Sequence, residues 1–484
     1  MTDWSLNPSV RKLLSRLPLP LSLPTPLPRA EGATCERELE GARAVLTSLQ
    51  DELDLGLALA FVTAGAAVTI VDPHPLAGLL HGLPGAHMPW SSDVAGGLLA
   101  AIRASGAHED RRTVVLIHRV RAGTDGDAAV NDGSDRLFAV GHAAAHLLRN
   151  SRMLLVLGED LLRAGDRGAL LAATAAGFCR SAHKELGRMG STAHVLRQDG
   201  AEPATLAHAA VFLAGPRASF LTGLDLRLGA AVGPVGAKMR GKVALVTGAA
   251  RGIGAAIARR LAAEGAHVWI NDLAAAESAA LETLAHIRKA GGTADFLPAD
   301  VATVQGAAVI AATLGQQHGG VDIVVHNAGI TRDRTLRKMS LAWWRLVLQV
   351  DFGAMVTVQG ALDPLLREGG AIVLLSSVTG VAGNFGQANY TAAKAAVIAL
   401  GQQWARAGVA RGVRANVVAP GFILTDMTSQ VPLLNREMAK QLTALLQPGL
   451  PGDVAELVCF LAGSGAVGLN GELVRCDGGM ALGK

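Results

Sequence analysis

The sequence predicts an α/β protein with two Rossmann-like domains, each a doubly wound parallel sheet, the N-terminal one degenerate and flavodoxin-like. In the second half, apolar runs of four to six residues alternate with helical stretches, which is typical of a parallel sheet covered by helices. The first half has the same rhythm in a blurred form and shares a repeat with the second half. A length of 484 residues suits two or three domains.

The composition excludes several classes of protein. Half of the residues are hydrophobic, 17% are charged and 58 are glycine, so the chain is globular rather than disordered or coiled coil. The formal net charge is +4 and there is no basic run, so nucleic acid is not an expected partner. The four cysteines are scattered and form no CxxC pair, which argues against a zinc or disulfide framework and favours a cytoplasmic location.

Residues 1–40 are expected to form an extended, proline-rich arm. The prolines between Leu17 and Arg29 break the helix that a signal peptide would need. The longest apolar stretch, Leu55–Val71, contains glycine and threonine and has the lowest length that could cross a bilayer as a helix. We expect it to form a buried helix, a turn and a strand, and we expect no membrane span.

Residues 41–236 are assigned to the degenerate domain, which we expect to scaffold, dimerise or shape a substrate entrance. Its candidate strands are Ala67–Val71, Thr113–Ile117, Met153–Leu157 and Ala193–Leu196. Leu206–Gly215 aligns with Val454–Gly463 at an offset of 248, which an internal repeat explains. No TGxxxGxG motif follows any early strand, so a second dinucleotide site is not expected.

A connector near Gly236 leads into the second domain, residues 237–484. Its candidate strands are Val243–Val246, His267–Ile270, Ile323–Val325, Ala371–Leu375, Ala415–Val418 and Leu473–Arg475. The first of them is followed by TGAARGIG (247–254) and then by a helical run. Glycines allow a tight turn and close backbone approach, while the helix N-terminus offers free N–H groups to a pyrophosphate. This motif predicts a dinucleotide site that includes Gly248, Arg251, Gly252, Ile253 and Gly254.

Asp272 ends the second strand of this domain, eighteen residues after Gly254. A carboxylate at about this spacing commonly holds the adenosine ribose and rejects a 2′-phosphate. Arg251 in the glycine loop could instead favour that phosphate. The balance favours NADH over NADPH as the cofactor.

Ser377, Tyr390 and Lys394 are the decisive candidates for catalysis. Tyr390 and Lys394 are four residues apart and would share one helix face, where the ammonium can stabilise the ionised phenol. That makes the tyrosine usable as an acid near neutral pH, and it is the single tyrosine of the chain. In the repeat, Ala173 and Gly177 take the places of Tyr390 and Lys394, and neither can do this chemistry.

Together with Asn327-Ala328-Gly329 and Pro420-Gly421, these motifs resemble the short-chain dehydrogenase/reductases. Within that family, ITRD (330–333), NVVAPGFILTDMT (416–428) and the ending CDGGM are similar to 3-oxoacyl-ACP reductases. The resemblance covers essentially the second half. A degenerate nucleotide-fold half in front of it resembles the high-molecular-weight branch of these reductases.

The resemblance implies hydride transfer from the nicotinamide to the 3-keto carbon of a 3-oxoacyl thioester. Tyr390 would protonate the developing alkoxide, Ser377 would hydrogen-bond the same oxygen, and Lys394 would hold the nicotinamide ribose. It also implies adenine contacts from Asp300 and Val301, for which a helix N-cap role of Asp300 is the alternative. The remaining implied cofactor contacts are Asn327, Ala328, Gly329, Tyr390, Lys394, Pro420, Gly421 and Ile423.

Asp351 departs from the family pattern, which has an asparagine here that completes a proton relay through water to the lysine. An aspartate accepts hydrogen bonds from a water and from Lys394, but it adds a charge and loses the amide donor. We expect slower turnover or a shifted pH optimum rather than inactivity.

The sequence thus predicts an NADH-preferring 3-oxoacyl-ACP or 3-oxoacyl-CoA reductase of fatty-acid metabolism, assembled as a homodimer or larger homo-oligomer. An NAD-linked 3-hydroxyacyl-CoA dehydrogenase, another alcohol or ketone oxidoreductase and a cofactor-binding pseudoenzyme stay open as alternatives. The apolar positions of Thr425–Leu446 suit a lid over the acyl chain or an ordinary amphipathic helix. His142 and His146 have no further ligand set in the sequence around them, so no metal site is predicted.

Overall fold

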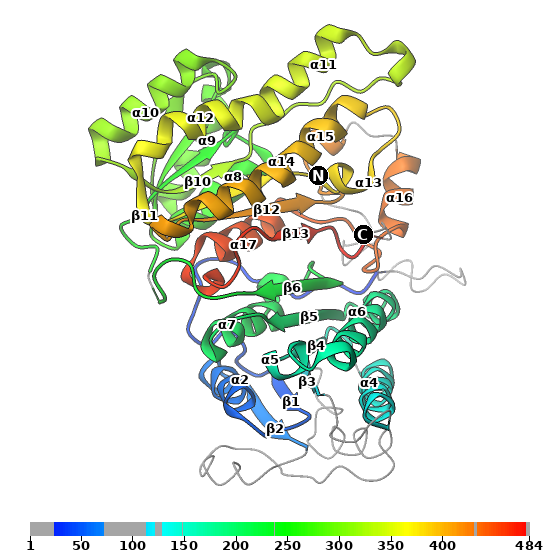
Figure 1. The fold of residues 1–484 in the computed structure, drawn as a ribbon. Coiled ribbons are helices and arrows are strands. Elements are labelled where there is room, and N and C mark those ends of the chain that lie inside the picture. The colour runs from blue at the N-terminus through cyan, green and yellow to red at the C-terminus, as the bar shows by residue number, and fades with distance from the viewer. Residues whose placement is uncertain are drawn as a thin grey trace.

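The computed structural model describes residues 24–71, 113–121, 128–147, 149–236, 238–429 and 433–480. These residues form two parallel β-sheets with helices on their faces, and the sheets lie edge to edge along the molecule (Figure 1). The predicted fold class, two Rossmann-like parallel-sheet domains, is confirmed. The proposed division at residue 236 falls in the connector between the last strand of one sheet and the first strand of the other.

The first sheet has the strand order β2-β1-β3-β4-β5-β6, and all neighbours are parallel. An order beginning 2-1-3-4-5 is that of flavodoxin-like sheets. Its strands are β1 Arg43–Leu46, β2 Ala67–Ile70, β3 Val114–Val120, β4 Arg152–Leu157, β5 Thr192–Gln198 and β6 Leu224–Leu228. Its helices are α2 Glu52–Thr63, α4 Ala128–Leu147, α5 Glu159–Leu162, α6 Gly165–Gly187, α7 Pro203–Ala214 and the short η3 Pro216–Ala218.

The second sheet has the order β13-β12-β11-β10-β7-β8-β9, again with parallel neighbours. The order reverses beside β7, as it does at the switch point of dinucleotide-binding sheets. Its strands are β7 Val243–Thr247, β8 His267–Asp272, β9 Thr293–Pro298, β10 Val321–His326, β11 Leu366–Leu375, β12 Arg414–Pro420 and β13 Leu473–Cys476.

The helices of the second half cover this sheet and extend beyond its edge. The α-helices are α8 Gly252–Ala263, α9 Glu277–Lys289, α10 Val304–His318, α11 Leu341–Leu348, α12 Ala354–Leu362, α13 Val378–Ala382, α14 Ala388–Gly408, α15 Asp426–Ser429, α16 Leu433–Gln441 and α17 Pro451–Ala462. The 3-10 helices are η4 Ala274–Ala276, η5 Leu336–Lys338, η7 Asp363–Leu365, η8 Val409–Arg411 and η9 Ser464–Ala466, and η6 Gln349–Gly353 is a π-helical turn.

Every strand that the sequence predicted is present, and the stretch 55–71 forms the end of α2, a turn and β2 as expected. Three strands were missed. β6 and β9 are sheet edges: β6 alternates buried and exposed residues, and β9 includes polar residues and a proline. β1 has only four residues, too few for a periodic pattern to stand out. A continuous apolar run indicates a strand that is buried on both faces. β6 and β9 are partly exposed, and β1 is too short to give such a run.

The interior strands supply most of the core. All residues of β3, β4, β7, β10 and β12 are buried, which suits a parallel sheet with helices on both faces. One hydrophobic cluster includes residues from both halves of the chain. The two halves therefore share a core instead of meeting through polar surfaces.

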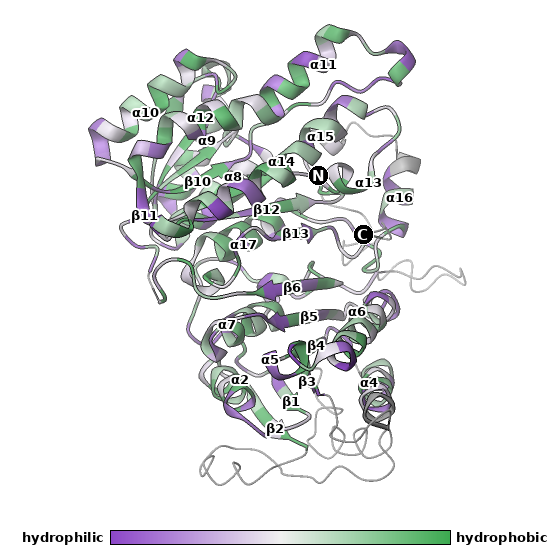
Figure 2. Cartoon of the chain, viewed as in Figure 1, coloured by the Kyte–Doolittle hydropathy of each residue, from purple (hydrophilic) through white to green (hydrophobic). Residues whose placement is uncertain are grey.

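The internal repeat appears as a pair of matching helices at the junction. The bounds of α7 and α17 differ by the same 248 residues as the aligned sequences, and so do those of η3 and η9. Both helices are largely hydrophobic, and β6 and β13 are the adjoining sheet edges (Figures 1 and 2). The equivalent residues Phe212 and Phe460 stack with ring centroids 3.9 Å apart. Contact between equivalent residues is the mark of a two-fold axis, so the halves pack like two subunits of a symmetric dimer.

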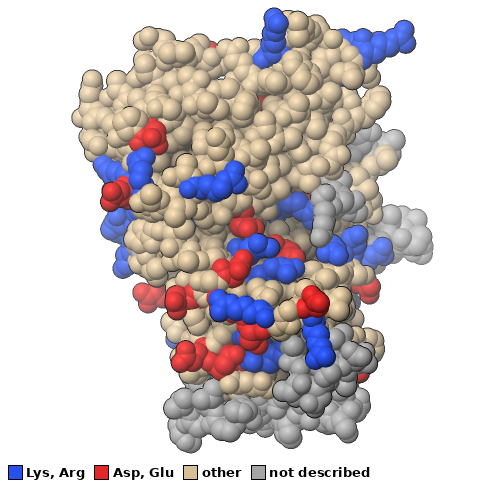
Figure 3. Space-filling view, in the orientation of Figure 1, with Lys and Arg blue, Asp and Glu red and all other residues tan. Residues whose placement is uncertain are grey.

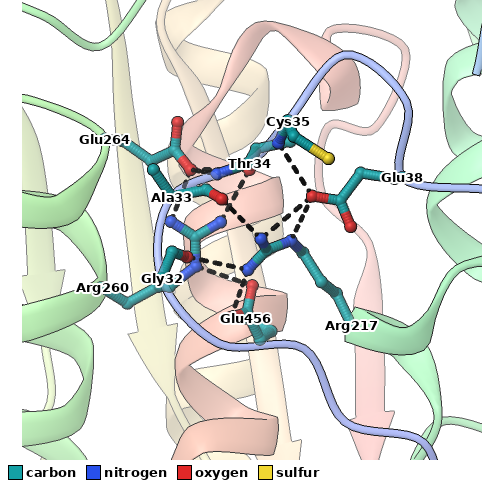
Figure 4. A network of polar contacts seen from close by, with 9 residues as sticks. All are labelled: Gly32, Ala33, Thr34, Cys35, Glu38, Arg217, Arg260, Glu264 and Glu456. Atoms are coloured by element: carbon teal, nitrogen blue, oxygen red, sulfur yellow. Dashed lines mark hydrogen bonds and ion pairs between the residues drawn. The ribbon is translucent and has the colours of Figure 1, made fainter.

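A buried polar network also joins the halves and the arm (Figure 4). Glu456 of α17 accepts a hydrogen bond from Arg217 at 2.8 Å and from Arg260 of α8 at 2.7 Å. Arg217 also binds Glu38 at 3.0 Å, and Arg260 binds Glu264 at 2.5 Å. Each arginine thus contacts two carboxylates, and the network connects the N-terminal segment, the first half and the helix that follows the glycine turn.

Part of the predicted arm is described, and residues 1–23 lie outside the described residues. Residues 24–40 contain no regular helix or strand, and residues 36–40 form a turn, so an extended arm over residues 1–40 stays a prediction. Arg29 binds Asp453 through two hydrogen bonds of 2.8 and 3.0 Å, and the Thr25 carbonyl accepts one from Gln447 at 3.0 Å. The described part of the arm is therefore attached to the second half.

Among the described residues, Leu341–Leu365 is long and apolar enough to cross a membrane by length and composition, with 28% of its apolar window buried. In the structure this stretch consists of α11, η6, α12 and η7, which contact α10 and α14. The expectation of no membrane span stays a prediction.

Candidate active site

The carboxyl edge of the second sheet carries the glycine motif. β7 ends at Thr247, and the chain turns through Gly248 into α8, which begins at Gly252. Gly248 and Gly252 both have a φ of +62°, a conformation that favours glycine. A Cβ atom on Gly254 would lie 2.6 Å from the side-chain nitrogen of Asn327 and closer still to the Gly248 carbonyl. The geometry of the turn therefore requires these glycines.

The N-terminus of α8 faces this edge. Arg251 is its N-cap residue with an exposed side chain, and Ile253 packs against the hydrophobic core. The first N–H groups of a helix have no partner within it, and they lie at the positive end of the helix dipole. This arrangement suits a bound pyrophosphate.

Asn327, the residue after the neighbouring strand β10, supports the glycine turn. Its side-chain amide donates hydrogen bonds to the carbonyls of Thr247 and Gly248, both at 2.9 Å. The backbone N–H groups of Asn327 and Ala328 donate to the Thr247 hydroxyl at 3.0 and 3.1 Å. Sequence reasoning gave Asn327 only a contact with the cofactor, and it missed this part in shaping the turn.

Asp272 ends β8 next to the glycine turn. One of its carboxylate oxygens accepts a hydrogen bond from the Ala250 N–H at 3.0 Å, and the other accepts one from the Leu273 N–H at 2.9 Å. The carboxylate is thus brought beside the turn, as its spacing from Gly254 led us to expect.

Asp300 and Val301 follow β9, the neighbour of β8. Asp300 is exposed and accepts a hydrogen bond from the Ala302 N–H at 2.9 Å, whereas Val301 is buried. The N-cap of α10 is Thr303, whose hydroxyl accepts a hydrogen bond from the Gly306 N–H at 2.9 Å. The alternative that Asp300 is the N-cap is therefore wrong, and its carboxylate stays a candidate contact for adenine.

Ser377, Tyr390 and Lys394 come together at the same edge. Ser377 follows β11 as the N-cap of α13, and its hydroxyl accepts a hydrogen bond from the Thr379 N–H at 3.1 Å. Tyr390 and Lys394 lie one turn apart on α14, with the ammonium 5.6 Å from the centre of the phenol ring. The side chains of Ser377 and Tyr390 face each other closely enough for the Ser377 hydroxyl to lower the pKa of the phenol.

Lys394 is held by buried contacts. Its Nζ donates a hydrogen bond to the Leu375 carbonyl at 3.0 Å and forms an ion pair with Asp351 at 3.2 Å. Burial lowers the pKa of Lys394, but Asp351 and Tyr390 outweigh this effect and leave the pKa above its usual value. Lys394 is therefore charged at neutral pH.

Asp351 lies in the π-helical turn η6 and is fully buried. Its Oδ1 accepts a hydrogen bond from the Ile330 N–H at 2.7 Å, and its Oδ2 faces Lys394. A Cβ atom on Gly329 would lie 2.9 Å from Oδ2, so this position has room only for glycine. Burial raises the pKa of the Asp351 carboxyl, and Lys394 and Ile330 offset the rise only in part.

The pKa of Tyr390 lies above its usual value of 10.0. Burial of the phenol raises the pKa, the Lys394 ammonium lowers it, and the Asp351 carboxylate raises it again. The lysine acts in the expected direction, but burial and the aspartate outweigh it.

Pro420 ends β12, and Gly421 and Ile423 follow it along the site. Ile423 is buried, and its backbone pairs with Gly449. Part of the predicted lid, residues 430–432, lies outside the described residues. Beyond it, the apolar side chains of Met438 and Leu442 are 60% and 53% exposed, which suits a segment that covers an apolar substrate better than one packed on the core.

Two buried polar residues beside the catalytic group escaped the sequence analysis as site residues. Asn389 accepts a hydrogen bond from the Tyr390 N–H at 2.8 Å and donates one to the Arg332 carbonyl at 3.0 Å. Ser376 donates to the Lys394 carbonyl at 2.7 Å. Both fix α14 against its surroundings. One indication of their role was present in the sequence: Asn389 directly precedes Tyr390, and Ser376 directly precedes Ser377.

Other sequence leads do not join this site. His142 and His146 lie on α4 with ring centres 4.2 Å apart, and the described residues contain no group of three or more metal-binding side chains. In the first sheet, charged side chains occupy the place that corresponds to the glycine turn of the second sheet. Buried Arg119 forms ion pairs there with Asp51 and Asp54.

The second half of the chain is similar in sequence to known reductases. Residues 248–481 match the family model described as enoyl-(acyl carrier protein) reductase. The 3-oxoacyl-[acyl-carrier-protein] reductase FabG of Staphylococcus aureus is 40% identical over 244 residues, which are 50% of this chain and 98% of that protein. The 3-oxoacyl-[acyl-carrier-protein] reductase of Synechocystis sp. is 40% identical over 244 residues, which are 50% of this chain and 97% of that protein. A crystal structure described as that of a candidate gluconate dehydrogenase from Agrobacterium tumefaciens covers 50% of this chain and 97% of its own, with a TM-score of 0.48 and 30% identity.

A doubly wound sheet with a glycine turn, Ser377, Tyr390 and Lys394 at its carboxyl edge defines a nucleotide-dependent oxidoreductase. The chain belongs to the short-chain dehydrogenase/reductase family, and its C-terminal half is of the 3-oxoacyl-ACP reductase (FabG) type.

Proposed function

We propose that the protein reduces the 3-keto group of 3-oxoacyl thioesters with a nicotinamide cofactor, in fatty-acid metabolism and in the cytoplasm. The observation that carries this proposal is the assembly of Ser377, Tyr390 and Lys394 beside the glycine turn. The names of the relatives supply the substrate class. The same groups would serve the reverse oxidation of a 3-hydroxyacyl-CoA, and both CoA and acyl carrier protein stay candidates for the carrier.

The residues at the sheet edge fit a dinucleotide. A Cβ atom on Gly252 would have Thr425 as its nearest neighbour, 4.0 Å away, so there is open space before the N-terminus of α8. The residues that would hold the cofactor are Gly248, Arg251, Gly252, Ile253, Gly254, Asp272, Asp300, Val301, Asn327, Ala328, Gly329, Tyr390, Lys394, Pro420, Gly421 and Ile423. Bound there, the reduced nicotinamide supplies the hydride.

The chain's own residues orient and protonate the ketone oxygen. Ser377 donates a hydrogen bond to that oxygen, and the Tyr390 hydroxyl gives it a proton as negative charge develops. Lys394 stabilises the phenolate left on Tyr390, because the ammonium lies 5.6 Å from the ring centre and is itself fixed by Leu375 and Asp351. The buried surroundings of Lys394 strengthen this attraction relative to water.

We infer that the protein prefers NADH, because a 2′-phosphate would lie against the Asp272 carboxylate. Purified protein should oxidise NADH faster than NADPH with acetoacetyl-CoA, as followed by absorbance of the reduced nicotinamide. Asp272→Ser should lower the ratio of kcat/KM for NADH over NADPH about tenfold or more, since like charges brought together cost several kcal/mol.

Asp300→Ser is the matched control for this ratio: Asp300 is an exposed carboxylate two residues after β9 and a candidate contact of the adenine, which both cofactors share, so the variant should leave the ratio unchanged. A wild-type preference for NADPH would contradict the role of Asp272. If neither cofactor is oxidised although both bind, the proposed function is wrong, and the protein either acts on another carbonyl substrate or is a cofactor-binding pseudoenzyme.

Asp351→Asn should move the pH profile. The carboxylate raises the pKa of Tyr390, so the variant tyrosine has a lower pKa. Ketone reduction needs protonated Tyr390 and is lost as the pH rises through that pKa, so the alkaline limb of kcat should shift to lower pH. The reverse oxidation of the alcohol needs the phenolate, so the acidic limb of its pH profile should also shift to lower pH. Profiles measured in both directions check the sign, and unchanged limbs would show that Asp351 does not act on Tyr390.

We also infer a homo-oligomer. The face over α12 and α14 has few charged side chains in Figure 3, whereas charges of both signs gather over β5, β6 and α6. A groove of about 510 Å³ on that face is lined mostly by apolar residues such as Val356, Gly360 and Trp404, together with Gln359 and the Arg411–Asp363 ion pair. An apolar, weakly charged face of this kind is typical of subunit contacts.

A further inference from the structure

The segment between α16 and α17 is joined to the wall of the active site. Gly449 donates a hydrogen bond to the Phe422 carbonyl at 3.0 Å and accepts one from the Leu424 N–H at 2.8 Å. These two bonds flank Ile423, the residue expected at the nicotinamide. The position of Ile423 therefore depends on the position of Gly449.

Phe220, from the non-catalytic first half, lies directly behind Gly449. Its side chain is 1% exposed and comes from the turn between η3 and β6. A Cβ atom on Gly449 would lie 2.6 Å from Phe220 Cε1 and still closer to Ile423 Cδ1. A Cβ atom on Gly478 would lie 2.8 Å from the same ring. The Phe220 ring and the Ile423 side chain therefore both occupy the side of Gly449 on which a Cβ atom would project, and the ring is held between Gly449 and Gly478.

Other residues of the first half hold the same segment. A Cβ atom on Gly187, the last residue of α6, would lie 2.5 Å from the Ala444 carbonyl oxygen. The Thr25 carbonyl of the arm accepts a hydrogen bond from buried Gln447 at 3.0 Å. Leu446 has a φ of +55°, which a non-glycine residue keeps only where its surroundings fix it. The segment is therefore held in one strained conformation from the side of the first half.

We propose that Phe220 is a positioning residue for the nicotinamide end of the active site, acting through Gly449 on Ile423. This inference rests on the proposed function of the site. It gives the first half a part in catalysis although that half has neither the tyrosine nor the lysine. Without the ring, the wall behind Gly449 is empty and Ile423 can move away from the cofactor.

Phe220→Ala should lower kcat for acetoacetyl-CoA reduction about 10–100-fold, because a misplacement of about 1 Å at the reacting atoms has effects of this size. The dissociation constant of NADH should change less than threefold, since the glycine turn and Asp272 are untouched. With NADH deuterated at the transferred position, the isotope effect on kcat should rise, because hydride transfer becomes slower than product release.

Phe212→Ala is the matched control. Phe212 is the same residue type in the same junction, but it stacks on Phe460 instead of contacting Gly449. This variant should keep wild-type kcat and isotope effect even if its melting temperature falls. Phe220→Leu should recover part of the kcat and serves as the test variant if Phe220→Ala does not fold.

Equal losses of kcat in the Phe212 and Phe220 variants would overturn the proposal, as would an unchanged kcat in Phe220→Ala or in the substitute Phe220→Leu. If the wild type does not reduce acetoacetyl-CoA, the proposed function fails. The fluorescence of bound NADH then still tests Phe220: a change in the Phe220 variant alone supports positioning, and no change overturns it.

Discussion

Tyr390→Phe is expected to lower kcat for 3-oxoacyl thioester reduction by about 10²–10⁴-fold, the usual contribution of a general acid. The substitution removes only the hydroxyl that gives its proton to the substrate oxygen, and the ring can keep its place against Lys394. NADH should bind to the variant nearly as well as to the wild type. Rates from nicotinamide absorbance and affinities from NADH fluorescence separate the two effects.

Because Tyr390 is the single tyrosine of the chain, its ionisation can be followed directly by ultraviolet absorbance. In the cofactor-free protein the phenol should ionise above pH 10.0, since burial raises its pKa and Lys394 offsets this only in part. The Phe variant provides the blank for that titration. Retention of more than about a tenth of the wild-type kcat would mean that another group supplies the proton.

Much of this site could be predicted from the sequence because its signals are local. The glycines of residues 247–254 are required by one tight turn, and Tyr390 and Lys394 share a face through the four-residue period of a helix. Asp272 follows from a fixed spacing within one strand–helix–strand unit. Each of these signals lies within one or two adjacent elements, where the chain geometry fixes distances.

The rest could not be predicted because it depends on contacts between distant segments. Phe220 and Gly449 are far apart in the chain, and nothing around Phe220 distinguishes it from an ordinary core phenylalanine. Asn389 and Ser376 look like ordinary polar neighbours of catalytic residues until their hydrogen-bond partners are known. Likewise, the sign of the Tyr390 pKa shift depends on how deeply folding buries the phenol, and spacing alone does not report burial.

The internal repeat indicates that the two halves of the chain stabilise each other. Equivalent helices α7 and α17 form the junction, so the first half covers an apolar surface of the second half. Beside this apolar contact, Glu456 is the one carboxylate of the Figure 4 residues that binds both Arg217 and Arg260. Glu456 therefore connects α17 both to Arg217 of the first half and to Arg260 on α8 of the second half.

Glu456→Ala is expected to lower the free energy of unfolding by about 1–3 kcal/mol, because buried N–H groups of Arg217 and Arg260 lose their shared acceptor although each arginine keeps a second carboxylate. The side chains of Glu456, Arg217 and Arg260 are only 10%, 7% and 8% exposed, so water cannot easily replace the lost carboxylate. The variant should also unfold in two steps in urea if the wild type unfolds in one, since the link between the halves is weakened. Circular dichroism follows both halves, and NADH binding reports the second.

Asp225→Ala is the matched control for this prediction. Asp225 binds Arg197 through two hydrogen bonds of 2.6 and 2.8 Å, but it is 37% exposed and its pair lies within the first half. An exposed pair of this kind contributes at most about 1 kcal/mol, so the control should lose little stability and keep the wild-type unfolding profile. A loss in Glu456→Ala no larger than that of the control would mean that the apolar contact of α7 with α17 holds the halves together without the network. A large loss with a single transition would mean that the network stabilises the second half rather than the junction.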